Sequence, residues 1–323
     1  MSNIINKNIE NVNKFIGEVE ETFKNVKAKN VNVSYKFPTE HKEHTKLKEC
    51  SQSLFTTIFQ HNTTKDYKKN ISFFACKSKF CPICNKIKSN KLSSNMYNII
   101  KQLQEEQDQQ FIFLTLTVKN CNIENLSDTI KRMNEAWRDL WRRYFNKPGR
   151  FNGFIKFLEI TFPNSKEAHP HFHILLSVNS DYFKRSNTEY LNTKNIAELW
   201  QRVLKVDYTP ICDIRIIKPK KTKSGVITKE AIPAVISEMC KYPMKDTDYK
   251  KLSKETMEKL YNELYRKRLI ASGGNLKISL AKIEQVDCVE VEENEIDEWK
   301  KIAYIVMKYI ENGYVIGSAD WYN

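Results

Sequence analysis

The chain has 323 residues, enough to bury a sizeable core and to form one large or two to three small domains. Lysine and arginine total 53 against 39 acidic residues, which gives a net charge of +14 and a pI near 9.2. This excess favours a polyanionic partner, nucleic acid first and an anionic membrane surface second, over the alternative of a basic surface without a partner. The N-terminus lacks the apolar core of a signal peptide, and no stretch approaches the ~18 apolar residues of a membrane span. These features predict a cytosolic (cytoplasmic) protein whose eight cysteines are thiols or metal ligands.

The first half of the chain changes character several times. Residues 1–45 are rich in Asn, Lys and Glu and are interpreted as a variable, partly helical arm. Residues 46–90 carry four cysteines and little helical periodicity. The β-branched and aromatic run FIFLTLTV, at 111–118, predicts a buried strand. An apolar stripe predicts a helix from about Ser127, and FIKFLEITF at 154–162 alternates as a strand.

The second half alternates strands and helices. A strand over about 171–178 precedes an amphipathic helix at 194–204 and a further strand, CDIRII, at 212–217. A basic loop follows with Lys220, Lys221 and Lys223, and a helix is predicted over about 230–242. Two C-terminal helices are expected, at about 254–269 and 294–312. The first of these ends in a second basic cluster, Arg266, Lys267 and Arg268.

Three of the six histidines lie within the five residues His169-Pro170-His171-Phe172-His173. They belong to the apolar run HPHFHILLSV, which is typical of a strand, and alternate strand residues point to the same face. His169, His171 and His173 therefore share a face and can grip one divalent ion, although imidazole alone does not select the metal. The alternative is a set of solvated histidines on a half-exposed strand.

A cysteine cluster precedes this region. Cys76, Cys81 and Cys84 are closely spaced, and the pair Cys81 and Cys84 forms a Cys-x2-Cys knuckle, a common half of a structural zinc site. Cys50 can complete a tetrahedron, with His61 as the competing ligand. Four thiolates would make a closed, non-catalytic site that staples a segment of low apolar content. The alternative is unrelated reduced cysteines, which is how we interpret the scattered Cys121, Cys212, Cys240 and Cys288.

A tyrosine and two charged residues are spaced to share a helix face in AVISEMCKYPMK. Glu238 lies four residues before Tyr242, and Lys245 follows three residues after it. A tyrosine beside a cation or a metal-held phosphate can attack phosphorus, and a carboxylate one turn away can take a proton. Taken alone, the pattern favours the alternative, a tyrosine without a catalytic role at a helix end that is stopped by Pro243.

Together these motifs resemble the Rep_1 type of plasmid rolling-circle replication initiators, within the HUH endonucleases. The resemblance covers most of the chain after residue 46, in the family's order. It is carried by KECSQSLFTTIF, FFACKSKFCPICNKIKS, FIFLTLTVKN, FLEITFPNSKEAHPHFHILLSV, ISEMCKYPMKDTDY and RLIASGGNLK. Lysines replace arginines common in the cysteine element, and Pro243 directly follows the tyrosine. The resemblance implies an α+β HUH endonuclease fold: an antiparallel central sheet flanked by helices, a zinc-binding segment and a C-terminal helical region.

The resemblance also implies roles for residues. His171 and His173 would be paired ligands of a catalytic Mg²⁺ or Mn²⁺, with Glu159 slightly favoured over His169 as the third ligand. Tyr242 would attack the scissile phosphate, Glu238 would activate water for termination, and Lys245 would steady negative charge. The structural Zn²⁺ would be held by Cys50, Cys76, Cys81 and Cys84.

Four segments and several partners follow from the resemblance. The segments are 1–45, the arm; 46–105, zinc-binding; 106–250, the nicking and joining domain; and 251–323, a helical region for DNA binding or oligomerisation. The partners are origin DNA, single-stranded and hairpin DNA, a host helicase and a host polymerase, with a possible homodimer and no membrane. The alternative functions are a histidine-triad nucleotide hydrolase and a non-catalytic, zinc-stabilised DNA-binding regulator.

Overall fold

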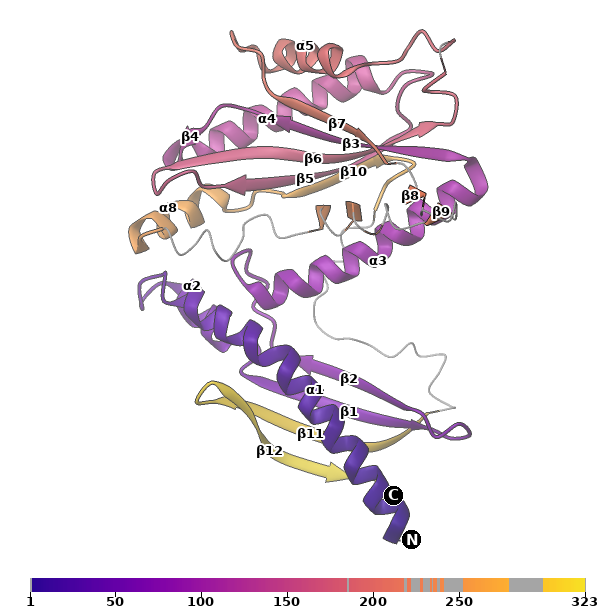
Figure 1. Cartoon of the computed structure of the whole chain (residues 1–323). Coiled ribbons are helices and arrows are strands. Elements are labelled where there is room, and N and C mark those ends of the chain that lie inside the picture. The colour runs from indigo at the N-terminus through magenta and orange to yellow at the C-terminus, as the bar shows by residue number, and fades with distance from the viewer. Residues whose placement is uncertain are drawn as a thin grey trace. The chain divides into compact units, whose positions relative to one another are not determined.

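The structure is a computed structural model that describes residues 2–184, 186–217, 252–278 and 299–322, together with 220, 221, 227, 228, 233, 235, 236, 239 and 240. The chain divides into two compact units, each described here by itself (Figure 1). Unit 1 comprises residues 1–88 and 284–323, and unit 2 comprises residues 89–283. The division into four segments by activity stays a prediction.

Unit 2 is built on an antiparallel sheet with the strand order β10-β5-β6-β3-β7 (Figure 1). The strands are β3 (Gln109–Thr117), β5 (Gly153–Thr161), β6 (Glu167–Asn179), β7 (Cys212–Ile216) and β10 (Ile270–Gly274). A short strand, β4 (Cys121–Asn122), pairs with the start of β6. The strands predicted from the runs at 111–118, 154–162, 171–178 and 212–217 are confirmed, because runs of this composition pair readily in a buried sheet.

Helices lie on both faces of this sheet. On one face are α4 (Leu126–Leu140), between η1 (Ile123–Asn125) and η2 (Trp141–Phe145), and α5 (Thr193–Leu204). Their Trp137 and Trp200 contact Phe154 and Phe172, with ring centroids 5.0 and 6.3 Å apart. The other face packs against α3 (Pro82–Gln107), in a core that includes Leu92 and Met96. The α+β class, with an antiparallel sheet flanked by helices, is therefore confirmed.

The helix α8 (Lys254–Leu264) occupies the first part of the predicted helix at 254–269. It ends five residues early, and Arg266 has a positive φ of 55°, so the cluster Arg266, Lys267 and Arg268 lies in the turn before β10. Of the predicted basic loop, Lys220 and Lys221 form β8 (Lys220–Lys221), which pairs with β9 (Ile227–Thr228). Lys223 lies outside the described residues.

Unit 1 contains a second antiparallel sheet with the strand order β12-β11-β1-β2. Its strands are β1 (Ser53–His61), β2 (Tyr67–Phe73), β11 (Trp299–Ile310) and β12 (Gly313–Trp321). The long helix α1 (Ser2–Ser34) packs on one face of this sheet, where Val19 is buried with Leu54 and Ile305. The short helix α2 (Lys42–Glu49) contacts α1. The predicted N-terminal arm thus contains a helix that covers a sheet.

The prediction of a helix over 294–312 is wrong, because residues 299–310 of this segment form the strand β11. Ile310 pairs with Gly313, so Glu311 and Asn312 form a two-residue loop, with φ of 48° and 70°. Two positive φ values are the mark of a type I′ hairpin turn, whose central positions favour Gly, Asn and Asp. This local turn and the many β-branched and aromatic neighbours outweigh the helical spacing of the apolar residues.

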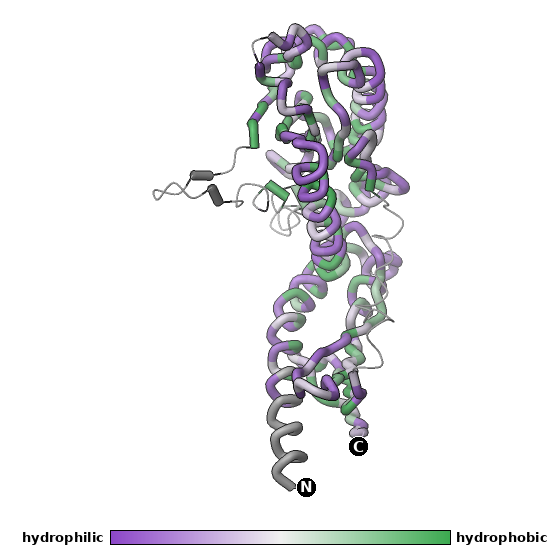
Figure 2. The backbone as a smooth tube through the Cα atoms, turned by 90° about the vertical axis from the view of Figure 1, so that its right-hand side faces the viewer, coloured by the Kyte–Doolittle hydropathy of each residue, from purple (hydrophilic) through white to green (hydrophobic). Residues whose placement is uncertain are grey.

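No helix in the part of the chain that the structure describes is long and apolar enough to cross a membrane. In Figure 2 hydrophilic and hydrophobic residues follow one another along the described helices, as expected for helices that bury one face and expose the other.

Candidate functional site

The pairing of β5 with β6 brings a glutamate opposite the histidine strand. Glu159 is paired with His171, while Phe157 is opposite His173 and Thr161 is opposite His169. Directly paired residues in an antiparallel sheet have neighbouring side chains on the same face. The alternation predicted from the sequence is therefore present, and it gathers one carboxylate and the imidazoles on one face of unit 2.

Three of these side chains converge. The Oε2 atom of Glu159 lies 2.6 Å from Nε2 of His173 and 3.3 Å from Nε2 of His171. Their ligand atoms all lie within 4.8 Å of one another, close enough to hold one metal ion. The side chains of His171, His173 and Glu159 are 12%, 16% and 20% exposed, so the cluster is largely buried and still reaches solvent.

The other ring nitrogen of each histidine is also engaged. Nδ1 of His171 lies 3.2 Å from the carbonyl oxygen of His169, and Nδ1 of His173 lies 3.3 Å from the hydroxyl of Thr115. A carbonyl only accepts, so His171 carries a proton on Nδ1 and directs Nε2 toward Glu159. Phe113 stacks on the His173 ring, with centroids 5.3 Å apart. Such outer contacts fix ring orientation in metal sites.

The electrostatics of Glu159 suit a cation. Burial by itself raises the pKa of Glu159, but hydrogen bonds and positive charge from His171 and His173 outweigh burial and hold its pKa well below the usual range. A divalent ion among the three groups would require an ionised carboxylate and neutral imidazoles. One carboxylate and two imidazoles form a donor set that fits a divalent metal, with coordination positions left for another ligand.

His169 stands apart from this cluster. Its ring centroid is 5.4 Å from that of His171, yet it does not belong to the group whose ligand atoms converge. Burial lowers the pKa of His169, and its buried Nδ1 atom has no hydrogen-bond partner. Between the two predicted candidates for the third ligand, the geometry brings Glu159, not His169, to the paired histidines.

The three predicted functional residues of the tyrosine motif, Glu238, Tyr242 and Lys245, lie outside the described residues. The structure does describe some of their neighbours. Met239 and Cys240 are buried in the core that also contains Phe113 and Phe157, on the sheet face that carries the histidines. The hydroxyl of Ser89 donates to the carbonyl oxygen of Cys240 at 2.5 Å, and the Cys240 thiol contacts the sulfur of Met96.

In unit 1 the four predicted cysteines come together. The sulfur of Cys50 lies 3.6 Å from that of Cys84 and 3.5 Å from that of Cys81, and the sulfurs of Cys76 and Cys84 are 3.8 Å apart. All four are buried. Zinc–sulfur bonds of about 2.3 Å place tetrahedral sulfurs about 3.8 Å apart, so these thiols fit a tetrahedral metal ion. His61 is not among the grouped ligands.

A buried lysine accompanies this cluster, and sequence analysis missed it. Lys27 of α1 is fully buried, and its Nζ atom donates to the carbonyl oxygens of Lys48 and Cys50 at 2.6 Å each. Burial lowers the pKa of Lys27 to about 8, although the nearby cysteines raise it. Hydrogen bonds from the other three cysteines hold the pKa of Cys84 far below its usual range. A cation at this position would offset negative charge that develops on the sulfurs.

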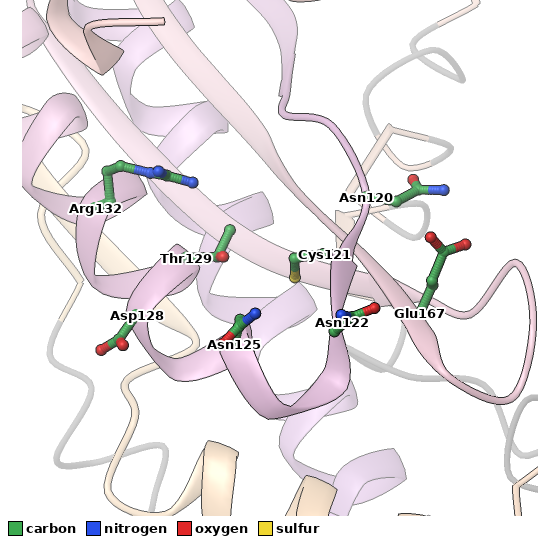
Figure 3. A pocket seen from close by; sticks show the side chains of 8 residues that line it. All are labelled: Asn120, Cys121, Asn122, Asn125, Asp128, Thr129, Arg132 and Glu167. Carbon is green, nitrogen blue, oxygen red and sulfur yellow. The ribbon is translucent and has the colours of Figure 1, made fainter.

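The remaining cysteines are not part of a cluster among the described residues. Cys240 is buried, Cys121 and Cys212 are half-buried, and Cys288 lies outside the described residues. Cys121 lines a polar pocket of about 590 Å³ between β4 and the start of α4, with Arg132 and Thr129 on the helix side (Figure 3). Its walls include none of Glu159, His171 and His173, so this pocket is separate from the convergent cluster.

Comparison with known proteins assigns the chain to a family. The sequence profile of the Rep_1 family, described as Replication protein, matches residues 51–315. A protein named Protein rep from Streptococcus pneumoniae is 33% identical over 77% of each chain, and a Protein rep from Bacillus amyloliquefaciens is 34% identical over 83% of this chain and 82% of its own. A third, from Lentilactobacillus hilgardii, is 29% identical over 83% of this chain and 84% of its own. No solved structure matches the chain significantly.

The chain belongs to the Rep_1 replication protein family, as the resemblance predicted. Membership supports a role in the initiation of plasmid replication, with binding to origin DNA.

Proposed function

We propose that this replication protein is a rolling-circle initiator that nicks and rejoins origin DNA by HUH chemistry. The observation that carries the proposal is the convergence of Glu159, His171 and His173 on one sheet face. A cluster of this kind, in a basic chain of +14, suits a phosphodiester substrate. In the alternative function, a histidine-triad nucleotide hydrolase, the middle histidine is a nucleophile. Here Nε2 of His171 faces the carboxylate of Glu159, which supports a role as a metal ligand over a role as a nucleophile.

Glu159, His171 and His173 would hold the metal ion, and the mixed oxygen and nitrogen donors favour Mg²⁺ or, in particular, Mn²⁺. When bound, the ion would polarise the scissile phosphate. The contribution of the chain is orientation. Thr115 and the carbonyl of His169 fix the imidazole rings, and Phe113 packs against His173.

Tyr242 is the proposed nucleophile. Its phenol oxygen forms a bond to phosphorus while the bond from phosphorus to the 3′ oxygen breaks; the phenol proton leaves to a base, and the 3′ oxygen takes up a proton. The products are a 5′-phosphotyrosine and a 3′-hydroxyl that primes a host polymerase, behind a host helicase. Glu238 would activate water for termination, and Lys245 would steady negative charge. Burial of the neighbouring Met239 and Cys240 on the histidine face supports this assignment.

The buried cysteine cluster is proposed to hold a structural Zn²⁺ through Cys50, Cys76, Cys81 and Cys84. Four thiolates leave no coordination position open, so the site would stabilise unit 1 and take no part in the reaction. The reduced thiols that zinc requires agree with a cytoplasmic location, and a homodimer is compatible with this function.

The test is a nicking assay on supercoiled plasmid that carries the cognate origin. The full chain should convert it to open circles only when Mg²⁺ or Mn²⁺ is supplied, and His171→Ala should abolish conversion while origin binding persists. Conversion that continues at full rate without a divalent ion, or in His171→Ala, would contradict the proposal.

A further inference from the structure

The sheet of unit 1 has two chemically different faces. Leu54, Ile58, Ile305 and Met307 point to the side where α1 packs, and the ion pair between Glu18 of α1 and Lys69 of β2, at 2.7 Å, lies on the same side. Alternate residues of a strand point to opposite faces. The residues between these positions therefore form a second face, which neither α1 nor α2 covers within unit 1.

Aromatic residues recur along this second face. The pairing of β1 with β11 places Phe55 beside Val306, Thr57 beside Tyr304, Phe59 beside Lys301 and His61 beside Trp299. A bulge after Ile58 keeps Lys301 and Trp299 on this side. The rings of Phe55, Phe59, Trp299 and Tyr304 are half-buried, and Tyr322 is 42% exposed.

Lysines are interleaved with these rings. The Nζ atom of Lys301 lies 5.1 Å from the centroid of the Tyr304 ring and 4.2 Å from that of Tyr322. Lys68, which is paired with Phe59, lies 5.5 Å from the Trp299 ring, and Lys308 at the other end is exposed. Among the paired positions of this face that the structure describes, one residue is acidic: Asp320, which lies opposite Tyr304.

We propose that this face binds single-stranded DNA. Every base has a π face that can stack on an aromatic ring, and lysines between the rings can neutralise the phosphates. A four-stranded antiparallel sheet with helices on one side and rings on the other is a form that proteins use to stack unpaired bases. The choice of DNA rests on the replication role of the family, which exposes single strands at an origin.

The chemistry of the face favours this occupant over a second protein surface. Lysine is depleted in protein–protein interfaces, whereas three lysines stand among the rings here. The rings are also separated by Thr57, Asn70 and Ser72, so they form no continuous apolar patch. Positive charge beside half-buried rings is complementary to a flexible polyanion with unpaired bases.

The binding test uses the full chain and a fluorescein-labelled oligothymidine of about 16 nucleotides, the upper end of the site size of one stacking domain. It lacks an origin sequence, so nicking does not enter the measurement. Fluorescence anisotropy should show that Phe59→Ala and Tyr304→Ala each weaken binding on the order of tenfold. Tyr304→Phe keeps the ring and should bind normally. Tyr35→Ala, which removes a ring that is 53% exposed just after α1, is the matched control.

Crosslinking locates the strand without any substitution. Oligothymidine that contains iododeoxyuridine should crosslink on illumination to peptides from β1 or β11. Unchanged affinity in a folded Phe59→Ala/Tyr304→Ala double variant, or crosslinks confined to residues 89–283, would overturn the proposal. Equal affinity for oligouridine would overturn the assignment to DNA. Light scattering gives a further outcome. If the unsubstituted chain is a dimer, the double variant is a monomer, and both bind DNA equally, the face binds a second copy of the chain and the proposal is overturned.

The outcome is separable from that of the nicking proposal. Tyr242→Phe should bind oligothymidine normally, because the binding face belongs to unit 1. Absence of nicking by the unsubstituted chain, together with oligothymidine binding that depends on Phe59 and Tyr304, counts against the catalytic proposal alone. Normal nicking together with unaltered oligothymidine binding in the double variant counts against the binding proposal alone.

Discussion

Glu159 sets the charge of the convergent cluster, because its carboxylate lies within 3.3 Å of both histidine rings. Glu159→Gln keeps the shape of the side chain and removes the charge that a cation requires. We expect this variant, and His173→Ala, to lose Mn²⁺ affinity by at least about tenfold, as losses of supporting groups alone reach 10–100-fold in metal sites. Electron paramagnetic resonance of free Mn²⁺ during a titration measures the affinity.

His169→Ala is the matched control for the ligand set, since its ring lies beside the cluster and does not converge on it. It should lose much less affinity than Glu159→Gln. A loss in His169→Ala that equals or exceeds the loss in Glu159→Gln would make His169 the third ligand.

Lys156 lies on β5 with its side chain on the opposite face, where Nζ donates to Asn134 at 2.5 Å and lies 3.7 Å from the Phe172 ring. Burial lowers the pKa of Lys156 from 10.5 to about 7. Between these values the unfolded chain binds more protons than the folded chain, so this group makes stability rise with pH across that window.

Urea unfolding at several pH values tests this effect. The free energy of unfolding of the unsubstituted chain should rise from pH about 7 toward 10.5 relative to that of Lys156→Met, which does not titrate there. Lys131→Met, at an exposed position on α4, should follow the unsubstituted chain. Parallel curves for Lys156→Met and the unsubstituted chain would show that burial does not lower the pKa of Lys156.

At the scale of elements, the hairpin of β11 and β12 depends on its turn. Asn312 has a φ of 70°, which a β-branched residue adopts only with strain of about 1–3 kcal/mol. Asn312→Val should lower the free energy of unfolding of unit 1 by about that amount, whereas Asn312→Gly should cost little. Urea denaturation followed by circular dichroism measures both. Equal stability of the two variants would argue against the type I′ turn.

The cysteine cluster links α2, the segment after β2 and the start of α3. Metal binding to such a site is coupled to folding, so loss of one thiolate removes both metal and stability. Cys81→Ser should lose about one Zn²⁺ per chain by elemental analysis and unfold at lower temperature. Cys212→Ser, a half-buried thiol outside the cluster, should keep its zinc. Freshly reduced protein that contains no zinc would refute the assignment.

Elements with a strong local pattern were predictable from the sequence. The alternation of HPHFHILLSV indicated β6, and the apolar stripes indicated α4 and α5. The strand β11 was not predicted, because Ile302, Ile305 and Tyr309 are also spaced as in a helix. The dipeptide Asn312-Gly313 at the end of this run is a turn signal, and it could have distinguished a hairpin from a helix that continues to residue 312.

The candidate site was predictable only in part, because only some of its residues belong to a local sequence pattern. The two-residue spacing of His171 and His173 is local, and the neighbouring strand suggested Glu159. Thr115 and Phe113, which contact the His173 ring, come from β3. Thr115 lies 58 residues before His173, so no local sequence pattern connects these residues to the histidines. Lys27 was missed because its role depends on the packing of α1 against a cysteine cluster distant in sequence.

At the scale of the whole molecule, unit 1 is not continuous in sequence. Unit 1 combines the first 88 residues with the last 40, and Ser53 of β1 pairs with Lys308 of β11. Pairings across such separations are set by burial of a shared face, not by local propensity, so a segment-by-segment reading cannot find them. The cysteine cluster of unit 1 and the Glu159 cluster of unit 2 thereby belong to different compact units.

The central claim is that Tyr242 becomes covalently joined to the 5′ phosphate of nicked origin DNA. Its most direct test is mass spectrometry of peptides after incubation of the full chain with Mn²⁺ and a labelled single-stranded oligonucleotide that contains the cognate nick site. The account predicts an adduct on Tyr242 that disappears in Tyr242→Phe while the oligonucleotide still binds. An adduct on another residue, Tyr249 being the nearest tyrosine in the sequence, or cleavage without any adduct, would contradict it.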